Sequence, residues 1–585
     1  MSLFRDLLIE KKRRRYFCEL EYLESTGTQY IDTGYAFNSN TDTIELGYQN
    51  KSTLANKWLF GSYEDNANIG ISSANLSQVT FWYKGNVWGA VSSQYDKEHI
   101  LRYDSTGMSN DGVNLKAFTS YVGTWNLYLF ALNNTGTSPN GYFGYGKIFY
   151  YKQTRNGVLI RDFIPVLDWN MTPCMYDKVS GQLFYTVGTD NFTAGREIHY
   201  VEYLEATGTQ YINTGMVSTA DSKVNTTFGF TTMESGSANN CAVFGGRNNT
   251  TTTTFTFFKL ASGNPQYFRF DYNSQITVGT ANQMTWDNSS VYRFEYDGST
   301  AKSTNITTGQ SESVSRSPGS SFTTSPILLF AVGTNTQAGQ FMSGRIYRYW
   351  YTDGTNTIDL RPAIDENGVG FMFDKVQHVC YLNAGTGVFK YPARQIEYLQ
   401  STGGQYIDTG IQPTDSYGYS IRNSYTVGGG EQCAIGCMDS GNRFVGIYTS
   451  GSENAISGAW GDFVGFLPNY TWTTGTILEV KSNYKNSRQI TIGDTLMKDI
   501  TDIHISGTIG NTVYLFARHY GSTITTMKGK MYCAEITNGQ NIVATYIPAF
   551  KDGAAGMLDK VNNVFYTNAG TGTFVCGKII EPKYE

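Results

Sequence analysis

An acidic position inside a repeated phrase is the first candidate for chemistry in this chain. The phrase has fourteen residues and occurs three times, as "EYLESTGTQYIDTG" (21–34), "EYLEATGTQYINTG" (202–215) and "EYLQSTGGQYIDTG" (397–410). The acidic position is Asp32 in the first copy, Asn213 in the second and Asp408 in the third. An amide keeps the side-chain oxygen but discards the charge that a general base needs. The exchange favours a hydrogen bond to nearby backbone at a turn before Thr-Gly, and a calcium ligand is the alternative.

A second acidic residue recurs near the end of each repeat. It opens the tripeptide "DKV", as Asp177, Asp374 and Asp559, and is followed by lysine each time. This pattern predicts a role in a tight turn or a surface ion pair.

Arrangements typical of catalytic sites are missing. Retaining glycosidases need two carboxyl groups about 5 Å apart, which strands supply as E-x-D-x-E, and this pattern is absent. The five histidines do not recur at equivalent places, and no serine or cysteine nucleophile accompanies them. Cys433 and Cys437 form a lone CxxxC without partner histidines. We therefore expect no catalytic residue, no cofactor and no metal ligand.

The repeated phrase also sets the domain organisation. Its copies begin at Glu21, Glu202 and Glu397, so the spacings are 181 and 195 residues. Such units are large enough for separate cores and too long for a solenoid. The predicted division is an N-terminal segment (1–17) and three domains (18–196, 197–393 and 394–585).

Composition and shared motifs indicate an all-β fold. Charged residues make up only 16% of the chain, while glycine (63), tyrosine (43) and phenylalanine (34) are abundant. Each repeat carries a short apolar strand ending in glycine, a "LFA" segment, a "G[KR]I" segment ("GKM" in the third repeat) and a closing Gly-rich "GTG.F" segment ("GTDNF" in the first). Alternating strands at short, regular spacing predict a sandwich or barrel. Within the repeated phrase we expect first-strand contacts and the turn from Tyr30, Asp32, Gly34, Tyr211, Asn213, Gly215, Tyr406, Asp408 and Gly410.

These motifs together resemble a laminin-G-like, concanavalin-A-like jelly-roll module. The resemblance rests on "EYLESTGTQYIDTG", the "LFA…G[KR]I" pair and "DKV…FY.N.GTG.F", and covers about residues 19–580. It implies three tandem jelly-roll β-sandwich domains of a kind seen in bacteriophage virion proteins and in surface proteins of gut bacteria. Such modules bind sugars, bind proteins or build structures.

The N-terminal segment belongs to no repeat. A short helix with an apolar side, followed by the basic run "KKRRR", predicts a docking peptide. Its docking residues are Leu3, Phe4, Leu7, Leu8, Lys11, Lys12, Arg13, Arg14 and Arg15. Nucleic-acid contact, an anionic membrane surface and a solvated tail are the alternatives.

Charge and hydropathy narrow the function classes. The net charge of −5 gives no general attraction to nucleic acid, and no apolar run is long enough to span a membrane. The cysteines do not recur with the repeats, so we expect reduced thiols and no disulfide framework. The N-terminus does not resemble a secretory signal.

The sequence therefore predicts a non-enzymatic bacteriophage virion protein, such as a tail fibre, head fibre or capsid decoration protein. We expect it to be made in the host cytoplasm and bound to other virion proteins through residues 1–17. Host or mucosal glycans are the expected ligands, and a homo-oligomer is compatible with this organisation. A bacterial surface carbohydrate-binding protein and a polysaccharide-degrading enzyme are the alternatives. Many tyrosine and tryptophan side chains flank the expected loops, including Trp350 between Tyr349 and Tyr351, and exposed rings of this kind stack on sugars.

Overall fold

Every element that the structure describes is a β-strand, which confirms the all-β prediction. The computed structural model describes residues 16–580, except 65–66, 76–77, 85, 93–96, 118, 232–240, 249–252, 260–267, 274, 279–285, 319–320, 335–336, 415, 440–442, 451–454, 462, 485–487, 494, 501–507 and 540. The expected N-terminal helix and basic run lie outside these residues. Within the described residues, no helix of the length and hydropathy of a membrane span is found.

The chain divides into two compact units. The first extends to Phe389 and contains two copies of the repeated phrase, and the second is Lys390–Pro582 and contains the third copy. The domain boundaries expected at 196/197 and 393/394 stay predictions.

The first repeat forms two antiparallel sheets. The larger one is centred on β13 (Tyr145–Arg155), which pairs with β2 (Leu23–Thr26) at one end, β14 (Val158–Leu167) at the other and β4 (Asp42–Asn50) along its second edge. The first repeat also contributes β1 (Cys18–Leu20), β9 (His99–Asp104), β10 (Gly107–Asn110), β11 (Val113–Ala117), β15 (Pro173–Asp177), β16 (Gln182–Phe184) and β17 (Thr193–Ala194) to this sheet, which continues into the second repeat. The second sheet has the order β3 (Ile31–Asp32), β12 (Tyr128–Leu129), β5 (Lys57–Glu64), β6 (Ala67–Asn75), β7 (Gln78–Tyr83) and β8 (Asn86–Ser92).

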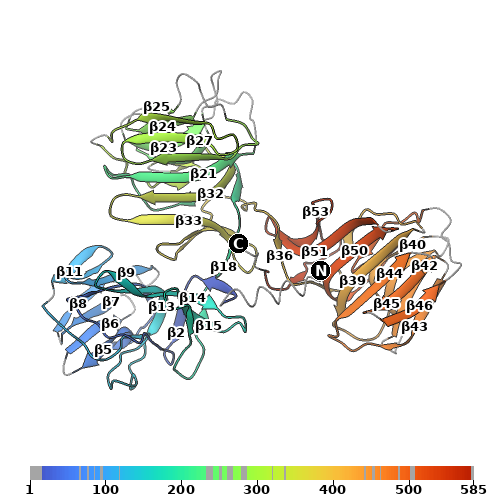
Figure 1. Cartoon of the computed structure of the whole chain (residues 1–585), viewed down its shortest axis with the longest axis horizontal. Coiled ribbons are helices and arrows are strands. Elements are labelled where there is room, and N and C mark those ends of the chain that lie inside the picture. The colour runs from blue at the N-terminus through green and yellow to red at the C-terminus, as the bar shows by residue number, and fades with distance from the viewer. Residues whose placement is uncertain are drawn as a thin grey trace. The chain divides into compact units, whose positions relative to one another are not determined.

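The second repeat has the same pairing pattern. Its central strand β32 (Ser343–Thr352) pairs with β19 (Leu204–Thr207), β33 (Thr357–Ile364) and β21 (Lys223–Phe230), and Figure 1 shows β21, β32 and β33 in green to yellow. The same sheet contains β18 (Glu197–Tyr200), β26 (Tyr292–Tyr296), β27 (Thr300–Asn305), β28 (Ser311–Ser315), β34 (Gly370–Asp374) and β35 (Cys380–Tyr381). The opposing sheet contains β20 (Ile212–Asn213), β29 (Leu328–Leu329), β22 (Cys241–Arg247), β23 (Thr254–Lys259), β24 (Phe268–Tyr272), β25 (Gln275–Val278), β30 (Val332–Gly333) and β31 (Ala338–Gly339).

The third repeat again has a long central strand, β50 (Lys528–Asn538), between β39 (Tyr417–Tyr425) on one edge and β37 (Leu399–Thr402) and β51 (Asn541–Lys551) on the other. The rest of this sheet is β36 (Arg394–Gln395), β44 (Leu478–Tyr484), β45 (Arg488–Ile492), β46 (Thr495–Ile500), β52 (Ala554–Asp559), β53 (Val564–Thr567) and β54 (Val575–Cys576). The opposing sheet contains β38 (Ile407–Asp408), β47 (Tyr514–Leu515), β40 (Gln432–Met438), β41 (Phe444–Ser450), β42 (Ala455–Gly461), β43 (Phe463–Thr471), β48 (Ala517–Tyr520) and β49 (Thr523–Thr526).

The core of each sandwich is rich in aromatic rings from both sheets. In the second repeat, the Phe244 ring of one sheet lies 6.0 Å from Phe294 and 5.5 Å from Tyr349 of the other. Phe257 stacks on Phe294 with ring centroids 4.0 Å apart. These side chains come from alternate strand positions, because successive residues of a strand point to opposite faces.

A buried glutamine joins the beginning of each repeat to its end. The residue is Gln29, Gln210 or Gln405, and its Oε1 accepts the backbone N–H three residues earlier at 2.8–2.9 Å. In the first two repeats its Nε2 donates to the carbonyl that precedes the closing phenylalanine. The repeated opening phrase therefore binds the "GTG.F" segment of the same repeat.

A glycine in the closing segment allows the two segments to approach. A Cβ on Gly188 would lie 1.8 Å from the Thr28 carbonyl oxygen, and one on Gly385 would lie 2.0 Å from that of Thr209. Gly570 meets Gly404 in the same way, at 2.1 Å. No side chain fits at these distances, so the opening and closing phrases are fixed as a pair.

The closing phenylalanine packs on an unusual backbone position. Phe130, Phe330 and Phe516 of the "LFA" segments all have positive φ, between 62° and 64°, although none is glycine. Their rings lie 4.8, 5.1 and 4.9 Å from the closing phenylalanines Phe192, Phe389 and Phe574. Bulky residues rarely adopt this conformation, so the surrounding packing must maintain it.

Candidate functional site

The variable Asp/Asn position of the repeated phrase caps a turn. Its Oδ1 accepts the backbone N–H two residues later, from Gly34 to Asp32 at 2.8 Å, Gly215 to Asn213 at 3.0 Å and Gly410 to Asp408 at 2.9 Å. The three glycines have φ between 68° and 76°, a region that glycine adopts without strain. The side-chain oxygen performs this role with or without charge.

We expect Asp32→Asn to leave stability within about 0.5 kcal/mol, because the amide oxygen can accept the same bond. Asp32→Ala should lose about 1 kcal/mol, because the Gly34 N–H loses its acceptor. Urea denaturation of the two variants measures the difference, and equal losses would contradict the capping role.

The tyrosines of the phrase pack against other aromatic rings beside the turn. Tyr30 lies 4.9 Å from Tyr128, and Tyr406 lies 4.8 Å from Tyr514. In the second repeat Tyr211 lies 6.1 Å from Phe341. These rings attach the first short strand to its neighbours.

The recurring aspartates of "DKV" are buried. Asp177 and Asp374 are 0% exposed and Asp559 is 1% exposed, so the surface ion pair considered from the sequence is not what they form. Each Oδ1 accepts the backbone N–H two residues later, and also one N–H from the preceding strand. These buried aspartates therefore stabilise the turn between two strands by hydrogen bonding to its backbone.

Asp374 differs from the other two in its second oxygen. Asp177 Oδ2 accepts from Arg161 at 3.1 Å and Ser180 at 2.7 Å, and Asp559 Oδ2 accepts from Asn562 at 2.6 Å. Asp374 Oδ2 has no hydrogen-bond partner among the described residues. Burial raises the pKa of Asp374 to about 6. Hydrogen bonds from the backbone N–H groups of Asp359, Val376 and Gln377 lower this pKa but do not offset the effect of burial.

A polar row crosses the outer face of the larger sheet in the second repeat. The register places Glu295 on β26 opposite Asn225 on β21, then Asn225 opposite Trp350 on β32, then Trp350 opposite Asp359 on β33. The four side chains share one face, because directly paired residues of antiparallel strands point to the same side. Tyr349 and Tyr351, which flank Trp350, are fully buried, whereas Trp350 is half-buried.

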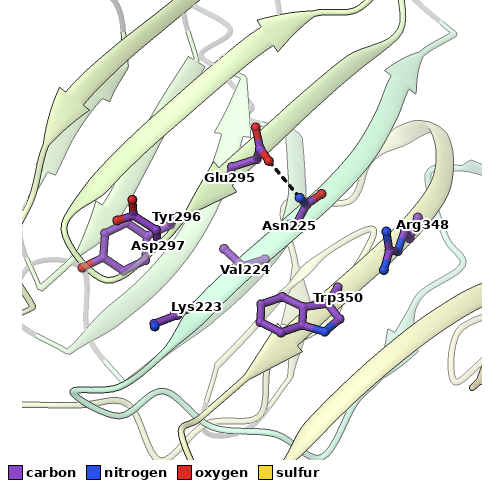
Figure 2. Close-up of a pocket in the computed structure, with 8 residues that line it drawn as sticks. All are labelled: Lys223, Val224, Asn225, Glu295, Tyr296, Asp297, Arg348 and Trp350. Carbon is purple, nitrogen blue, oxygen red and sulfur yellow. Dashed lines mark hydrogen bonds between the residues drawn. The ribbon is translucent and has the colours of Figure 1, made fainter. Parts of the chain in front are cut away.

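Hydrogen bonds fix the orientation of this row. Asn225 Nδ2 donates to Glu295 Oε1 at 2.9 Å (Figure 2), and Arg348 donates to both oxygens of Asp359 at 2.9 and 3.0 Å. A bidentate arginine–carboxylate pair is geometrically specific. The groups are therefore held in place before any ligand arrives.

Three residues of this row, Glu295, Asn225 and Trp350, line a shallow groove of about 270 Å³. Figure 2 shows Trp350 and Arg348 on one strand, with Lys223 and Asn225 on the next and Glu295 and Asp297 beyond. The groove offers an aromatic ring, an amide, carboxylates and cationic groups on a single face. Sugars need this combination, because their C–H faces stack on rings and their hydroxyls donate and accept hydrogen bonds.

The equivalent positions in the other repeats carry different chemistry. Counting from the glycine of "G[KR]I", Trp350 corresponds to Lys152 in the first repeat and Glu535 in the third. Lys152 faces Glu45 across the strands, and Glu45 also pairs with Arg102, so this face forms a ladder of ions. Of the three equivalent positions, only Trp350 of the second repeat places an indole ring on this face.

Sequence reasoning named Trp350 but missed its partners. Asn225 and Glu295 lie far from it in the chain and belong to no shared motif. The available signal was local: "RYWYT" (348–352) alternates half-buried residues with buried ones, and this places Trp350 beside Arg348 on the outer face. The nine predicted docking residues between Leu3 and Arg15 lie outside the described part of the chain.

No family model and no curated protein matches this chain. Among solved structures, it is similar to domains LG4-5 of the mouse laminin alpha1 chain, with a TM-score of 0.27, 11% identity and coverage of 68% of this chain and 100% of that one. It is also similar to the LG1-3 region of the laminin alpha2 chain, with a TM-score of 0.25, 10% identity and coverage of 94% and 99%. Both TM-scores are low, so this similarity by itself assigns neither a fold family nor a function.

Proposed function

We propose that this protein is a non-enzymatic structural protein of a bacteriophage particle, attached through residues 1–17 and displaying three laminin-G-like lobes for adhesion. Within it, the outer face of the second repeat binds a glycan. The observation that carries the binding role is Trp350, held half-buried between Asn225 and Asp359 in a row of oriented polar groups.

Several features support binding without catalysis. The carboxylates that line the groove are those of Glu295 and Asp297, and each accepts a hydrogen bond from a neighbouring side chain, Asn225 and Ser299. A groove of this depth contacts one side of a sugar chain and leaves the other in solvent. Weak binding at one groove becomes useful when many copies act together on a particle.

The test is a titration of the full chain with a panel of neutral and acidic oligosaccharides, followed by tryptophan fluorescence and calorimetry. We expect binding by the wild type and a loss of about tenfold or more in affinity for Trp350→Ala, because the stacking surface is removed. Trp350→Phe should retain part of the affinity, since the phenyl ring keeps a smaller stacking face.

The matched control is Trp125→Ala, which removes another half-buried indole from the first repeat. It should bind as the wild type does. Equal affinity of Trp350→Ala and the wild type for a bound glycan would overturn the assignment of this groove.

A further inference from the structure

The strands β1 and β18 bring together three side chains that can bind a metal ion. They pair antiparallel, with Glu19 opposite Ile198 and Leu20 opposite Glu197, so the same register places Cys18 beside His199. Glu197 and His199 are two positions apart on β18 and therefore share a face. The ligand atoms of Cys18, Glu197 and His199 all lie within 4.8 Å of one another.

Cys18 and His199 occupy the same position in two successive repeats. Each stands three residues before the glutamate that opens the repeated phrase, Glu21 or Glu202. In both repeats the next strand of the sheet is also equivalent: β1 pairs with β14 and β18 pairs with β33. The strands β14, β1, β18 and β33 thus form one continuous stretch of sheet with approximate twofold symmetry, and the Cys18–His199 pair lies at its centre.

The environment suits a small ion better than a substrate. His199 is 0% exposed and Cys18 is 2% exposed, whereas the Glu197 side chain is 18% exposed and opens toward solvent. Phe17 places its ring against the imidazole, with centroids 6.0 Å apart. A thiol, an imidazole and a carboxylate could also form a nucleophilic triad, but a polymer cannot reach a thiol buried to this extent.

We propose that Cys18, Glu197 and His199 bind one zinc ion at the junction of the first two repeats. Thiolate, imidazole and carboxylate are the three ligand types that zinc takes in proteins. A tetrahedral zinc ion holds its ligand atoms about 3.5 Å apart, so small side-chain rotations from the present positions suffice. Water from the exposed Glu197 side fills the fourth position.

Zinc binding displaces the protons and the hydrogen bond that the three side chains now hold. The Cys18 thiol releases its proton to solvent and coordinates as thiolate. The hydrogen bond between His199 Nε2 and Glu197 Oε2, at 2.8 Å, breaks, and its proton moves to Nδ1 of the neutral imidazole. The unprotonated Nε2 and the carboxylate then each bond to zinc. The ion then links β1 to β18, and so fixes the sheet of one repeat to that of the next.

The test uses the reduced, tag-free full chain, equilibrated with zinc or cobalt(II) and then desalted. We expect about one zinc per chain by mass spectrometry, and with cobalt the visible bands of a tetrahedral ion plus a thiolate charge-transfer band. Cys18→Ser should abolish the charge-transfer band, and His199→Gln should weaken metal affinity by at least about tenfold. Glu197→Gln, at the exposed ligand, tests the site with little risk to folding.

The matched control is Cys576→Ser, which removes a partly buried thiol from the other compact unit and should keep the full cobalt spectrum. The wild-type spectrum needs no variant, so misfolding of a substituted chain cannot obscure the result. Absence of bound metal in the wild type, or an unchanged thiolate band in Cys18→Ser, would overturn the proposal.

Discussion

Replacing Phe574 by alanine is expected to lower the free energy of unfolding of the unit Lys390–Pro582 by about 3–5 kcal/mol. Phe574 is 7% exposed and its ring lies 4.9 Å from Phe516. Truncation leaves a cavity, and it also removes the packing that holds Phe516 at a φ of 64°. Hydrogen exchange of the β37 and β50 amides in the full chain reports the loss, because these strands carry the opening phrase and its main partner.

The neighbouring residue provides the control. Val575 is 47% exposed, so Val575→Ala should change stability by no more than about 0.5 kcal/mol. A loss below about 1 kcal/mol for Phe574→Ala would mean that the closing phenylalanine is not what holds the repeat together.

The second large effect is a dependence of stability on pH that arises from Asp374. Its folded-state pKa is about 6, whereas an unfolded aspartate titrates near about 3.9. The Asp374 carboxyl group therefore binds its proton more tightly in the folded state than in the unfolded state. Its contribution to the free energy of unfolding is fully present below about pH 4. It is lost as the pH rises through about 6, by about 3 kcal/mol for a shift of two pKa units.

Asp374→Asn should remove this dependence. Its free energy of unfolding, measured relative to the wild type by urea denaturation, is expected to rise steadily between about pH 4 and pH 7. Glu202→Gln, which removes an exposed carboxylate from the same repeat, should follow the wild-type profile. A constant difference between Asp374→Asn and the wild type over that interval would show that Asp374 does not titrate in it.

The all-β class was predictable because alternation and turn residues are local signals. "FYTNAGTGTF" and "YIDTG" each contain the signals of a strand and a turn within a few residues. The role of the Asp32 side-chain oxygen in capping the turn follows from the Asp/Asn exchange alone. The joining role of Gln29 needed the structure, because its partner Asn191 is 162 residues away.

Burial at one position was equally hard to predict. "DKV" looks like an exposed turn, yet its aspartate is buried, and it accepts one N–H from the preceding strand and one from the turn itself. Neither the cysteines nor the histidines recur with the repeats when each residue type is taken alone, although Cys18 and His199 hold the same place in their repeats. This equivalence is visible only when different residue types are aligned between the repeats.

The pairing of β1 with β18 protects the edges of both strands. Strand β1 of the first repeat pairs with β18, the equivalent strand of the second repeat, and the equivalent residues Cys18 and His199 lie at the centre of the pairing. Isologous contacts of this kind are typical of homodimers, where one surface patch meets its own copy. The contact between the first two repeats thus has the symmetry of an isologous interface, although both strands belong to one polypeptide. The tether gives each edge strand a permanent neighbour at high effective concentration, so neither edge stays open to pair with another chain.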